Sequence, residues 1–581
     1  MASTGQRPRG AHFAPEDSGS ELVKERANKS SNMVSVLVII SRITGFLRTS
    51  VQAWALGASG LASAYTVANQ LPNLLYELVV GGMLITSFLP VYLSVKRRLG
   101  RSGASDYASN LLSVVVLLMA AVMVASFVFA EPIIWTQSAG ATEGFDSDLA
   151  VWFFRWFCCS VILYALSSIV SGILNAERDY LWSNLAPVFN NIITIASFTL
   201  YAVLTQQGMP WNEAVIVLAI GNPLGVAVQV FCQVPALMRR GVRLRPRIDL
   251  HDPAFKDTLS IGVPTLVCTF ASFPTTAVMS SCALSVTAAG ASVSYYARVW
   301  YVLPYSIFAI PISVTMFTEL SSSWLAHDTD RFRDFLADGV RKTLFTLVPC
   351  AMFLVVFAPT LIAVFASGQF TAEAAAQTAG YLQALALSLP LYALSTYLQK
   401  VCSSMIRMRV YAVATVVASA VQVVVCLALT PVGGLYVVPL SSVFFYGVID
   451  LVTLASIRGS LGRMGLGSVL PSLARACALG LAGSLVGWLV LTALTALLGP
   501  CQGALRSIIY ALVAGVPAIV VTFGTATALG VSDAPFFDSL FSRLLPRGAR
   551  RGCPAARPSG VRRSILCPED KALRGGKETD T

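Results

Sequence analysis

The sequence has few of the residues that usually carry enzyme chemistry. Histidine occurs only three times in 581 residues, as His12, His251 and His327, and all three lie outside the apolar segments. No Ser/His/Asp set can be assembled within those segments. A GxxxxGK[ST] phosphate-binding loop is also missing, which excludes ATP hydrolysis at a site of that type. We therefore expect a protein that is not an enzyme, with no catalytic residue and no cofactor.

Metal-ligating and disulfide patterns are missing as well. The twelve cysteines form no CxxC pair, and most of them, such as Cys232 and Cys426, lie within apolar runs. Cysteine in such a run behaves as a small hydrophobic residue, so we predict neither a metal site nor a disulfide framework. The first thirty residues lack an apolar core, and we expect no cleavable signal peptide.

Charge is scarce, and apolar residues are abundant. Only 12% of residues are charged, 55% are hydrophobic, and the mean hydropathy is +0.70. A soluble domain of this size needs far less apolar surface, so the composition indicates a polytopic membrane protein. The net charge of +12 falls in loops and in the C-terminal tail. Topology and anionic lipid explain this charge better than nucleic acid does, and we expect no nucleic-acid partner.

Stretches of about 20 apolar residues define the spanning helices. Fourteen such segments lie near 33–56, 61–95, 107–130, 149–175, 180–205, 212–238, 259–287, 290–320, 341–367, 374–404, 409–431, 433–457, 468–498 and 505–530. Lys and Arg gather after every second segment, as in 96–101 and 239–256. The positive-inside rule then places both termini in the cytoplasm. We predict an all-α polytopic membrane protein with about 14 transmembrane helices.

The long basic connection at 239–258 divides the helices into two sets of six, a common transporter plan with the substrate site between the halves. The predicted units are a disordered cytoplasmic tail (1–31), a first lobe (32–238), a cytoplasmic linker (239–258), a second lobe (259–457), two further helices (458–530) and a cytoplasmic C-terminal part (531–581). Residues 332–340 and 537–544 have the apolar spacing of interfacial amphipathic helices, and we predict a disordered tail after about residue 546.

Two arginines, Arg42 and Arg48, lie inside the first apolar segment. An Arg near the middle of a spanning helix costs about 2.5–3.5 kcal/mol on insertion scales. Six residues of helix correspond to about 9 Å of rise and about 120° of rotation, and Gly45 falls halfway between the two arginines. Guanidinium groups can bind phosphate or carboxylate through two parallel hydrogen bonds. The pair therefore predicts one wall of a pathway for an anionic molecule.

Other ionisable residues at membrane depth are also candidates for function. They are Glu77, Arg155, Arg298, Glu319, Lys400, Asp450 and Arg475. The charges of Glu319, Lys400 and Arg475 lie near cytoplasmic helix ends, where they can reach the interface. Two alternatives stay open for Glu77, which could line the site or pair with one of the arginines. Whether Arg155 faces the cavity is equally open.

The order of several motifs resembles one known family. Ser41-Arg42-Ile43-Thr44-Gly45-Phe46-Leu47-Arg48 and Leu71-Pro72-Asn73-Leu74-Leu75 resemble the opening of the MurJ/MviN family, the lipid II flippases of the MOP exporter superfamily. Further matches are Gly172-Ile173-Leu174-Asn175-Ala176, Arg247-Ile248-Asp249-Leu250-His251-Asp252, Tyr295-Tyr296-Ala297 and Gly368-Gln369-Phe370-Thr371. The resemblance covers about 33–530 and preserves both order and spacing.

The resemblance implies two six-helix lobes in a V shape around a cationic cavity. It also implies that the two C-terminal helices form a groove for a polyprenyl tail. Family arginines carry over onto Arg42 and Arg48, and the expected substrate-binding set is completed by Arg298, Glu77, Asn73 and Gly45. The chain departs from the family pattern at Ser63, where family members often have an acidic residue. It also departs at Arg298, because the corresponding family arginine usually comes one residue later, which is a rotation of about 100° around the helix.

The expected function is that of a flippase in the bacterial cytoplasmic membrane. It would move lipid II from the inner to the outer leaflet by alternating access, with the pyrophosphate held by the arginines. The alternatives are a flippase for another polyprenyl-linked glycan, a MATE-like exporter that uses Glu77 and Asp450 for cations, and a non-transporting cell-wall scaffold. Expected partners are lipid II or a related polyprenyl-pyrophosphate glycolipid and membrane lipids, with cell-wall synthesis proteins as candidate protein partners.

The alternation of basic and acidic loops predicts the topology. Residues 131–148 should be extracytoplasmic and residues 239–258 cytoplasmic, because only the second stretch is rich in Lys and Arg. Single cysteines placed in each stretch of a cysteine-free variant report this through labelling with an impermeant thiol reagent. Labelling of 239–258 from outside intact cells would overturn the helix count.

Overall fold

The computed structural model describes residues 17–242, 244–462, 464–501, 503–531 and 533–544. All regular elements of these residues are helices, and they contain no strand. The all-α prediction is therefore confirmed for the described part of the chain. The predicted tails at 1–16 and after 545 lie outside it.

The first lobe is built from α1 to α9. Its helices are α1 (Asp17–Leu56), α2 (Gly60–Tyr76), α3 (Gly82–Val128), α4 (Ala130–Ser138), α5 (Ser147–Phe157), α6 (Ser160–Ala176), α7 (Tyr180–Gln206), α8 (Trp211–Phe231) and α9 (Val234–Arg239). A π-helical turn, η1 (Glu77–Gly81), joins α2 to α3. Gly100 has a φ of 71° and breaks α3 into two helices that run in opposite directions.

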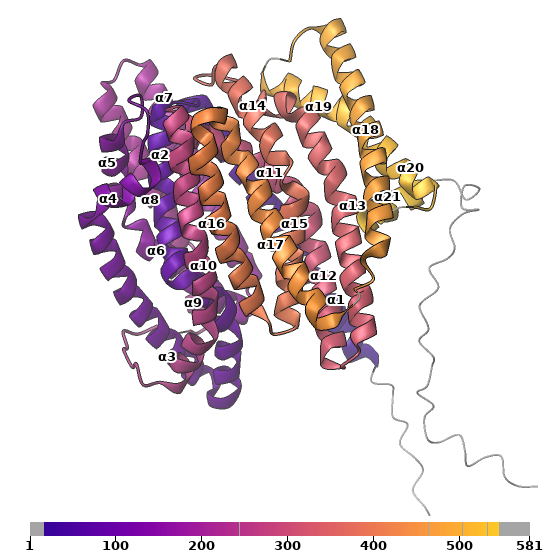
Figure 1. The fold of residues 1–581 in the computed structure, drawn as a ribbon. Helices are drawn as coiled ribbons and strands as arrows, with labels where there is room; N and C mark the ends of the chain where they lie inside the picture. Colours follow the sequence, from indigo (N-terminus) through magenta and orange to yellow (C-terminus); the bar gives the residue numbers. More distant parts are fainter. Residues whose placement is uncertain (1–16, 243, 463, 502, 532, 545–581) are drawn as a thin grey trace, which may run out of the picture.

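The second lobe is built from α10 to α17. Its helices are α10 (Pro253–Val286), α11 (Gly290–Pro304), α12 (Ile310–Leu325), α13 (Thr329–Ile362), α14 (Ala372–Ala386), α15 (Leu389–Ser404), α16 (Met408–Gly433) and α17 (Val437–Leu461). The π turn η2 (Tyr305–Ala309) joins α11 to α12, and the 3-10 turn η3 (Gly434–Tyr436) joins α16 to α17. The short η4 (Leu466–Ser468) leads to α18 (Val469–Leu498), and α19 (Ala504–Ile519), η5 (Val520–Gly524), α20 (Thr525–Ala528) and α21 (Pro535–Leu544) lie at the outer side of this lobe (Figure 1).

Corresponding helices of the two lobes bend in the same way. Pro72 in α2 and Pro304 at the end of α11 each come just before a π turn. Each proline lacks a backbone N–H and leaves a carbonyl of the preceding turn without its helical hydrogen bond. Leu71-Pro72 and Leu303-Pro304 are thus Leu-Pro pairs that come before a π turn in both lobes.

Length and hydropathy identify nine described helical stretches that could cross a membrane, or ten if the bent pair of α5 and α6 is one span. Some of these stretches contain two of the predicted segments, because Phe88–Val128 includes the reversal at Gly100 and Met408–Leu461 includes α16 and α17. Each predicted segment is helical in the structure. The count of fourteen stays a prediction.

The two lobes meet at one end of the molecule, which we call the closed end. Tyr296 donates a hydrogen bond to the Gly57 carbonyl at 2.9 Å, and Ser63 donates to Ser292 at 3.2 Å. The Gln369 amide donates to the Trp54 carbonyl at 3.0 Å. Gly57 has a φ of 65°, and a Cβ there would overlap the Gln369 carbonyl oxygen, so this close approach requires glycine.

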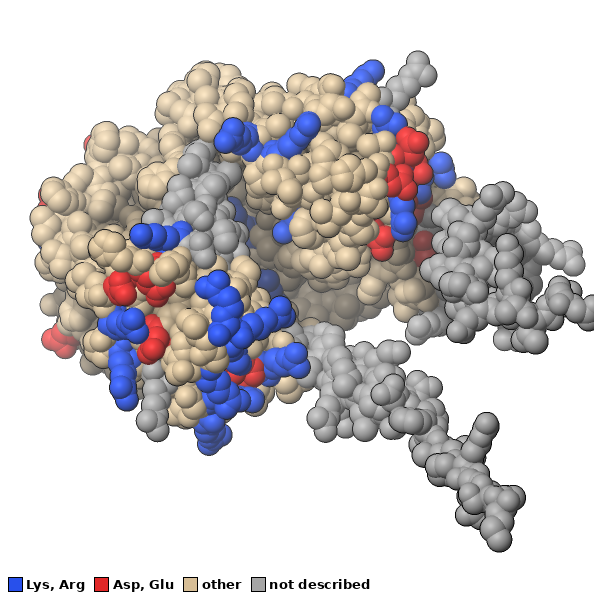
Figure 2. Space-filling view, turned by 90° about the horizontal axis from the view of Figure 1, so that it is seen from below, with Lys and Arg blue, Asp and Glu red and all other residues tan. Residues whose placement is uncertain are grey.

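The opposite end, which we call the basic end, carries the loops at 96–101 and 239–247. Figure 2 shows Lys and Arg side chains gathered on this face and a hollow between its two halves. The hollow ends at the closed end, where the lobes are hydrogen-bonded to each other. The protein is therefore open on one side only.

Side chains of α3 fix the basic linker to the first lobe. Asn110 donates to the Asp249 carbonyl at 2.8 Å and accepts from the Asp249 amide at 2.7 Å. Ser113 accepts from the Arg247 amide at 3.0 Å. A predicted loop thus runs along α3 as an ordered strap.

Two predictions about helix ends were wrong. Residues 17–31, which we predicted as part of a disordered tail, belong to α1. The stretch at 332–340 is not an interfacial helix but the start of α13, where Phe332 and Leu336 are buried against α15. The helix predicted at 537–544 is present as α21, with Phe537 stacked on Phe523 and Phe536 and Leu540 exposed, and its interfacial position stays a prediction.

The strap predicts a local weakness in one variant. Asn110→Ala should remove both hydrogen bonds to Asp249 and leave that backbone unsatisfied, which costs roughly 1–3 kcal/mol. We expect faster tryptic cleavage within 239–247 and a lower midpoint of thermal unfolding in detergent. Ser102→Ala, at an exposed position of the same helix, is the matched control. Equal cleavage of both variants would contradict the proposed anchoring.

Candidate functional site

The arginine-bearing part of α1 is held by α7. Asn191 of α7 donates a hydrogen bond to the Thr44 hydroxyl at 3.0 Å. A Cβ added to Gly45 would lie 3.7 Å from the same amide nitrogen, which is ordinary contact. Space alone therefore does not demand glycine at this position, and its place in the substrate-binding set stays a prediction.

Arg48 has phenol partners rather than a carboxylate. Its guanidinium donates a hydrogen bond to the Tyr295 hydroxyl of α11 at 3.4 Å, which links the two lobes. Tyr65 and Tyr164 also lie within electrostatic range of the guanidinium. These neutral hydroxyls orient the cation without cancelling its charge.

Arg42 and Arg298 are exposed. Their helices meet where the Phe46 ring of α1 packs edge-on against Trp300 of α11, with ring centres 5.1 Å apart. Phe46 lies between Arg42 and Arg48 in the sequence, and Trp300 follows Arg298 by two residues. The contact therefore places the arginine-bearing stretches of α1 and α11 side by side.

None of the three arginines forms an ion pair with a described residue. Glu77, the acidic candidate, is exposed and accepts a hydrogen bond from Asn73 at 3.0 Å. The alternative in which Glu77 pairs with an arginine is therefore wrong for this arrangement of the lobes. The structure brings Glu77 and Asn73 to each other, and it leaves the positive charge uncompensated.

Sequence reasoning missed the group of tyrosines around Arg298. Tyr301, Tyr381, Tyr392 and Tyr446 all lie within electrostatic range of this guanidinium. Tyr392 packs against Tyr305 and Tyr446, with ring centres 4.3 Å and 5.0 Å apart. These residues come from four helices and a π turn, so no local sequence pattern could have grouped them.

Four of the remaining ionisable candidates have partners within the protein. Arg155 pairs with Glu131 at 3.3 Å, and Glu319 pairs with Arg331 at 3.6 Å. The Lys400 ammonium lies over the Phe317 ring at 5.6 Å from its centre, and Arg475 donates to the backbone carbonyls of Pro471 and Val531. Their contacts are those expected of structural charges.

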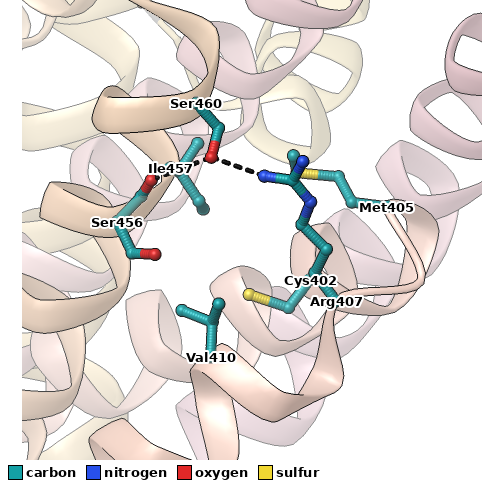
Figure 3. A pocket seen from close by; sticks show the side chains of 7 residues that line it. All are labelled: Cys402, Met405, Arg407, Val410, Ser456, Ile457 and Ser460. Atoms are coloured by element: carbon teal, nitrogen blue, oxygen red, sulfur yellow. Dashed lines mark hydrogen bonds between the residues drawn. The ribbon is translucent and has the colours of Figure 1, made fainter.

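A small, partly open pocket lies elsewhere, near the basic end of α15, α16 and α17. Figure 3 shows Arg407 reaching across it to the Ser460 hydroxyl, with Cys402, Val410 and Ile457 on the walls. Its volume of about 10 Å³ is about the space of one water molecule. It is too small for a substrate, so the hollow between the lobes is the candidate site.

A family model described as "Lipid II flippase MurJ" matches residues 52–489. The chain belongs to the lipid II flippase MurJ family. The match covers most of both lobes, including the closed end, the tyrosine group and Arg298, whereas Arg42 and Arg48 lie just before it.

Curated relatives in the MurJ family match about three fifths of this chain and about two thirds of their own length. A "Probable lipid II flippase MurJ" of Vibrio cholerae is 29% identical over 364 residues, which is 60% of this chain and 67% of that protein. The "Lipid II flippase MurJ" of Burkholderia cenocepacia is 25% identical over 362 residues, 61% of this chain and 69% of that protein. A Buchnera aphidicola relative with the "probable" description is matched over 66% of its length at 25% identity.

Solved structures show the same fold. A MurJ structure titled as an inward closed conformation has a TM-score of 0.68 at 19% identity and covers 85% of this chain and 98% of its own. An inward-facing multidrug resistance MATE transporter of the MOP superfamily has a TM-score of 0.62 at 15% identity and covers 75% of this chain and 99% of its own. The predicted MOP-type fold is therefore confirmed.

The Asn73–Glu77 hydrogen bond predicts a mild effect of one substitution. Glu77→Gln keeps an acceptor for Asn73 and leaves no cation without its partner, so membrane insertion and protein level should stay unchanged. Immunoblotting of membrane fractions, with Gln70→Ala at an exposed position of α2 as the control, measures this. A strong loss of Glu77→Gln that Arg48→Ala restores would reinstate the ion-pair alternative.

Proposed function

We propose that this protein moves lipid II from the inner to the outer leaflet of the bacterial cytoplasmic membrane. Membership of the MurJ family and the three arginines without carboxylate partners support the proposal. The uncompensated arginines carry most of its weight. A pyrophosphate offers the oxygens that guanidinium groups bind through paired hydrogen bonds.

In the proposed cycle, the basic end faces the cytoplasm together with both chain termini. The sugar-peptide head enters the hollow, and Arg42, Arg48 and Arg298 bind the pyrophosphate. The lobes then separate at the closed end and approach each other at the basic end, which exposes the head to the other side. Hydrogen bonds such as Ser63–Ser292 each contribute about 0.5–1.5 kcal/mol, so a few of them can break in a transport cycle.

The polyprenyl tail would stay in lipid beside α18 and α19. Helix α18 approaches α19 and η5 closely at Gly483, where a Cβ would overlap the Ala518 carbonyl of α19 and the Thr522 hydroxyl of η5. Their outer faces expose large apolar side chains such as Leu485 and Leu512. A surface of this kind suits contact with an isoprenoid chain.

The other functions are less well supported. A MATE-like cation exporter needs acidic residues in the cavity, but Glu77 is hydrogen-bonded to Asn73 and Asp450 is buried. A scaffold without transport would leave the unpaired arginines unexplained. A flippase for another polyprenyl-pyrophosphate glycan needs the same anion site, so only assays with defined lipids separate that possibility from lipid II.

Substitution of the arginines tests the proposal. Arg42→Ala or Arg48→Ala should abolish complementation of cells depleted of their own lipid II flippase, and Lys at either position should rescue only partly, because Lys lacks the planar fork. Loss of one charge-assisted hydrogen bond, about 1.5–3 kcal/mol, corresponds to at least about a tenfold loss of flipping in reconstituted vesicles. Protein levels should stay normal, since removing an unpaired cation lowers the insertion cost.

Arg97→Ala, at an exposed position of the basic end, is the matched control and should retain activity. If Arg42→Ala and Arg48→Ala both flip lipid II at the normal rate, the anion-binding mechanism is wrong. If both variants instead fail to accumulate, the arginines have a structural role.

A further inference from the structure

The second lobe contains a carboxyl group that the candidate site does not use. Asp450 of α17 is 4% exposed, and both of its carboxyl oxygens are buried without a hydrogen-bond partner. Among the described residues, it is the only Asp, Glu, Lys or Arg in the buried core. The hydroxyl of Thr453, one turn further along α17, is also buried without a partner.

No described charge faces Asp450 from the helices packed around α17. Their described ionisable side chains are Tyr392, Tyr397, Lys400 and Cys402 on α15, Arg409, Tyr411 and Cys426 on α16, Glu373 and Tyr381 on α14, and Lys256 and Cys282 on α10, with Tyr446 and Arg458 on α17 itself. Tyr397 donates to the Phe335 carbonyl, and Lys400 lies over Phe317. Of all these groups, only Tyr446 lies within electrostatic range of the Asp450 carboxyl.

A buried carboxylate with no cation and no donor is strongly unfavourable, whereas a neutral carboxylic acid in the same place costs far less. A metal cation would need several oxygen ligands, and Thr453 supplies the one unpartnered hydroxyl on the adjacent turn of α17. A single proton removes the charge without further ligands. We propose that Asp450 is a proton-binding site and that its proton stabilises the arrangement in which the lobes meet at the closed end.

Tyr446 connects this site to the substrate site. It lies within electrostatic range of both Asp450 and Arg298, and its ring packs on Tyr392 at 5.0 Å. Loss of the proton creates an anion that needs water or a cation, and the cation nearest to this group of tyrosines is Arg298. Satisfying the anion therefore requires helices of the second lobe to move, which links proton release to a different arrangement of the lobes.

The direction of this coupling rests on the function proposed above. If the basic end faces the cytoplasm, protons taken up from outside favour return of the empty protein to the arrangement seen here. The protein would then exchange outward-moving lipid for inward-moving protons.

Infrared difference spectroscopy tests the proton site without any substrate. The purified full-length protein at neutral pH should show the C=O stretch of a protonated carboxylic acid, and Asp450→Asn should lack that band. Glu77→Gln, which alters an exposed carboxylate, should keep it. Thr453→Val, which retains the carboxyl and removes the unpartnered hydroxyl one turn away, should shift the band. An unchanged band in both Asp450→Asn and Thr453→Val would overturn the assignment.

Distance measurements test the coupling. Spin labels at Ser147→Cys and Ala372→Cys, both exposed and one in each lobe at the closed end, report separation of the lobes in a cysteine-free variant. As the pH is raised, the short-distance population should fall in the parent protein and in Glu77→Gln, but stay constant in Asp450→Asn. The same pH response in Asp450→Asn, or no response in the parent, would overturn the coupling. Neither readout involves lipid II, so failure of the flippase proposal would leave both unaffected.

Discussion

Unpaired positive charge at membrane depth is the constraint on which the rest of this structure depends. Each arginine in a spanning helix costs about 2.5–3.5 kcal/mol on insertion scales, and no described carboxylate offsets Arg42, Arg48 or Arg298. Such charges persist only where water reaches them. The lobes therefore have to leave a hollow between them, and the helices that carry the arginines have to line it.

The contacts that close the other end suit the proposed movement of the lobes. The contacts there involve helix ends and small residues, such as Gly57 and the Ser63–Ser292 pair, together with buried alanines such as Ala53 and Ala291. Small side chains bury little area, and apolar area contributes only about 25 cal/mol per Å². The interface can thus exclude water in one state and still separate in the next. Ser63 takes part in this contact, which gives a structural role to a position where the family often has an acidic residue.

Much of the fold could be predicted from the sequence, because apolar length and loop charge act locally. The apolar segments, the two-lobe plan and the importance of α1 and α11 follow from such patterns. Features that depend on tertiary packing could not be predicted. The start of α13 looks like an interfacial helix until α15 covers Phe332, and the tyrosines around Arg298 come together from separate helices. The proposed binding of pyrophosphate depends on a ligand that no sequence pattern specifies.

The choice of tyrosine rather than carboxylate around the arginines has a physical reason. A carboxylate beside Arg48 would form a charge-assisted pair that competes directly with phosphate for the same donors. The Tyr295 hydroxyl accepts one hydrogen bond and fixes the guanidinium, yet it leaves the charge and the other donors free. In the second lobe, the tyrosines around Arg298 also separate it from the carboxyl of Asp450. Phenols therefore let one protein hold cations ready for an anionic ligand and keep its buried acid apart from them.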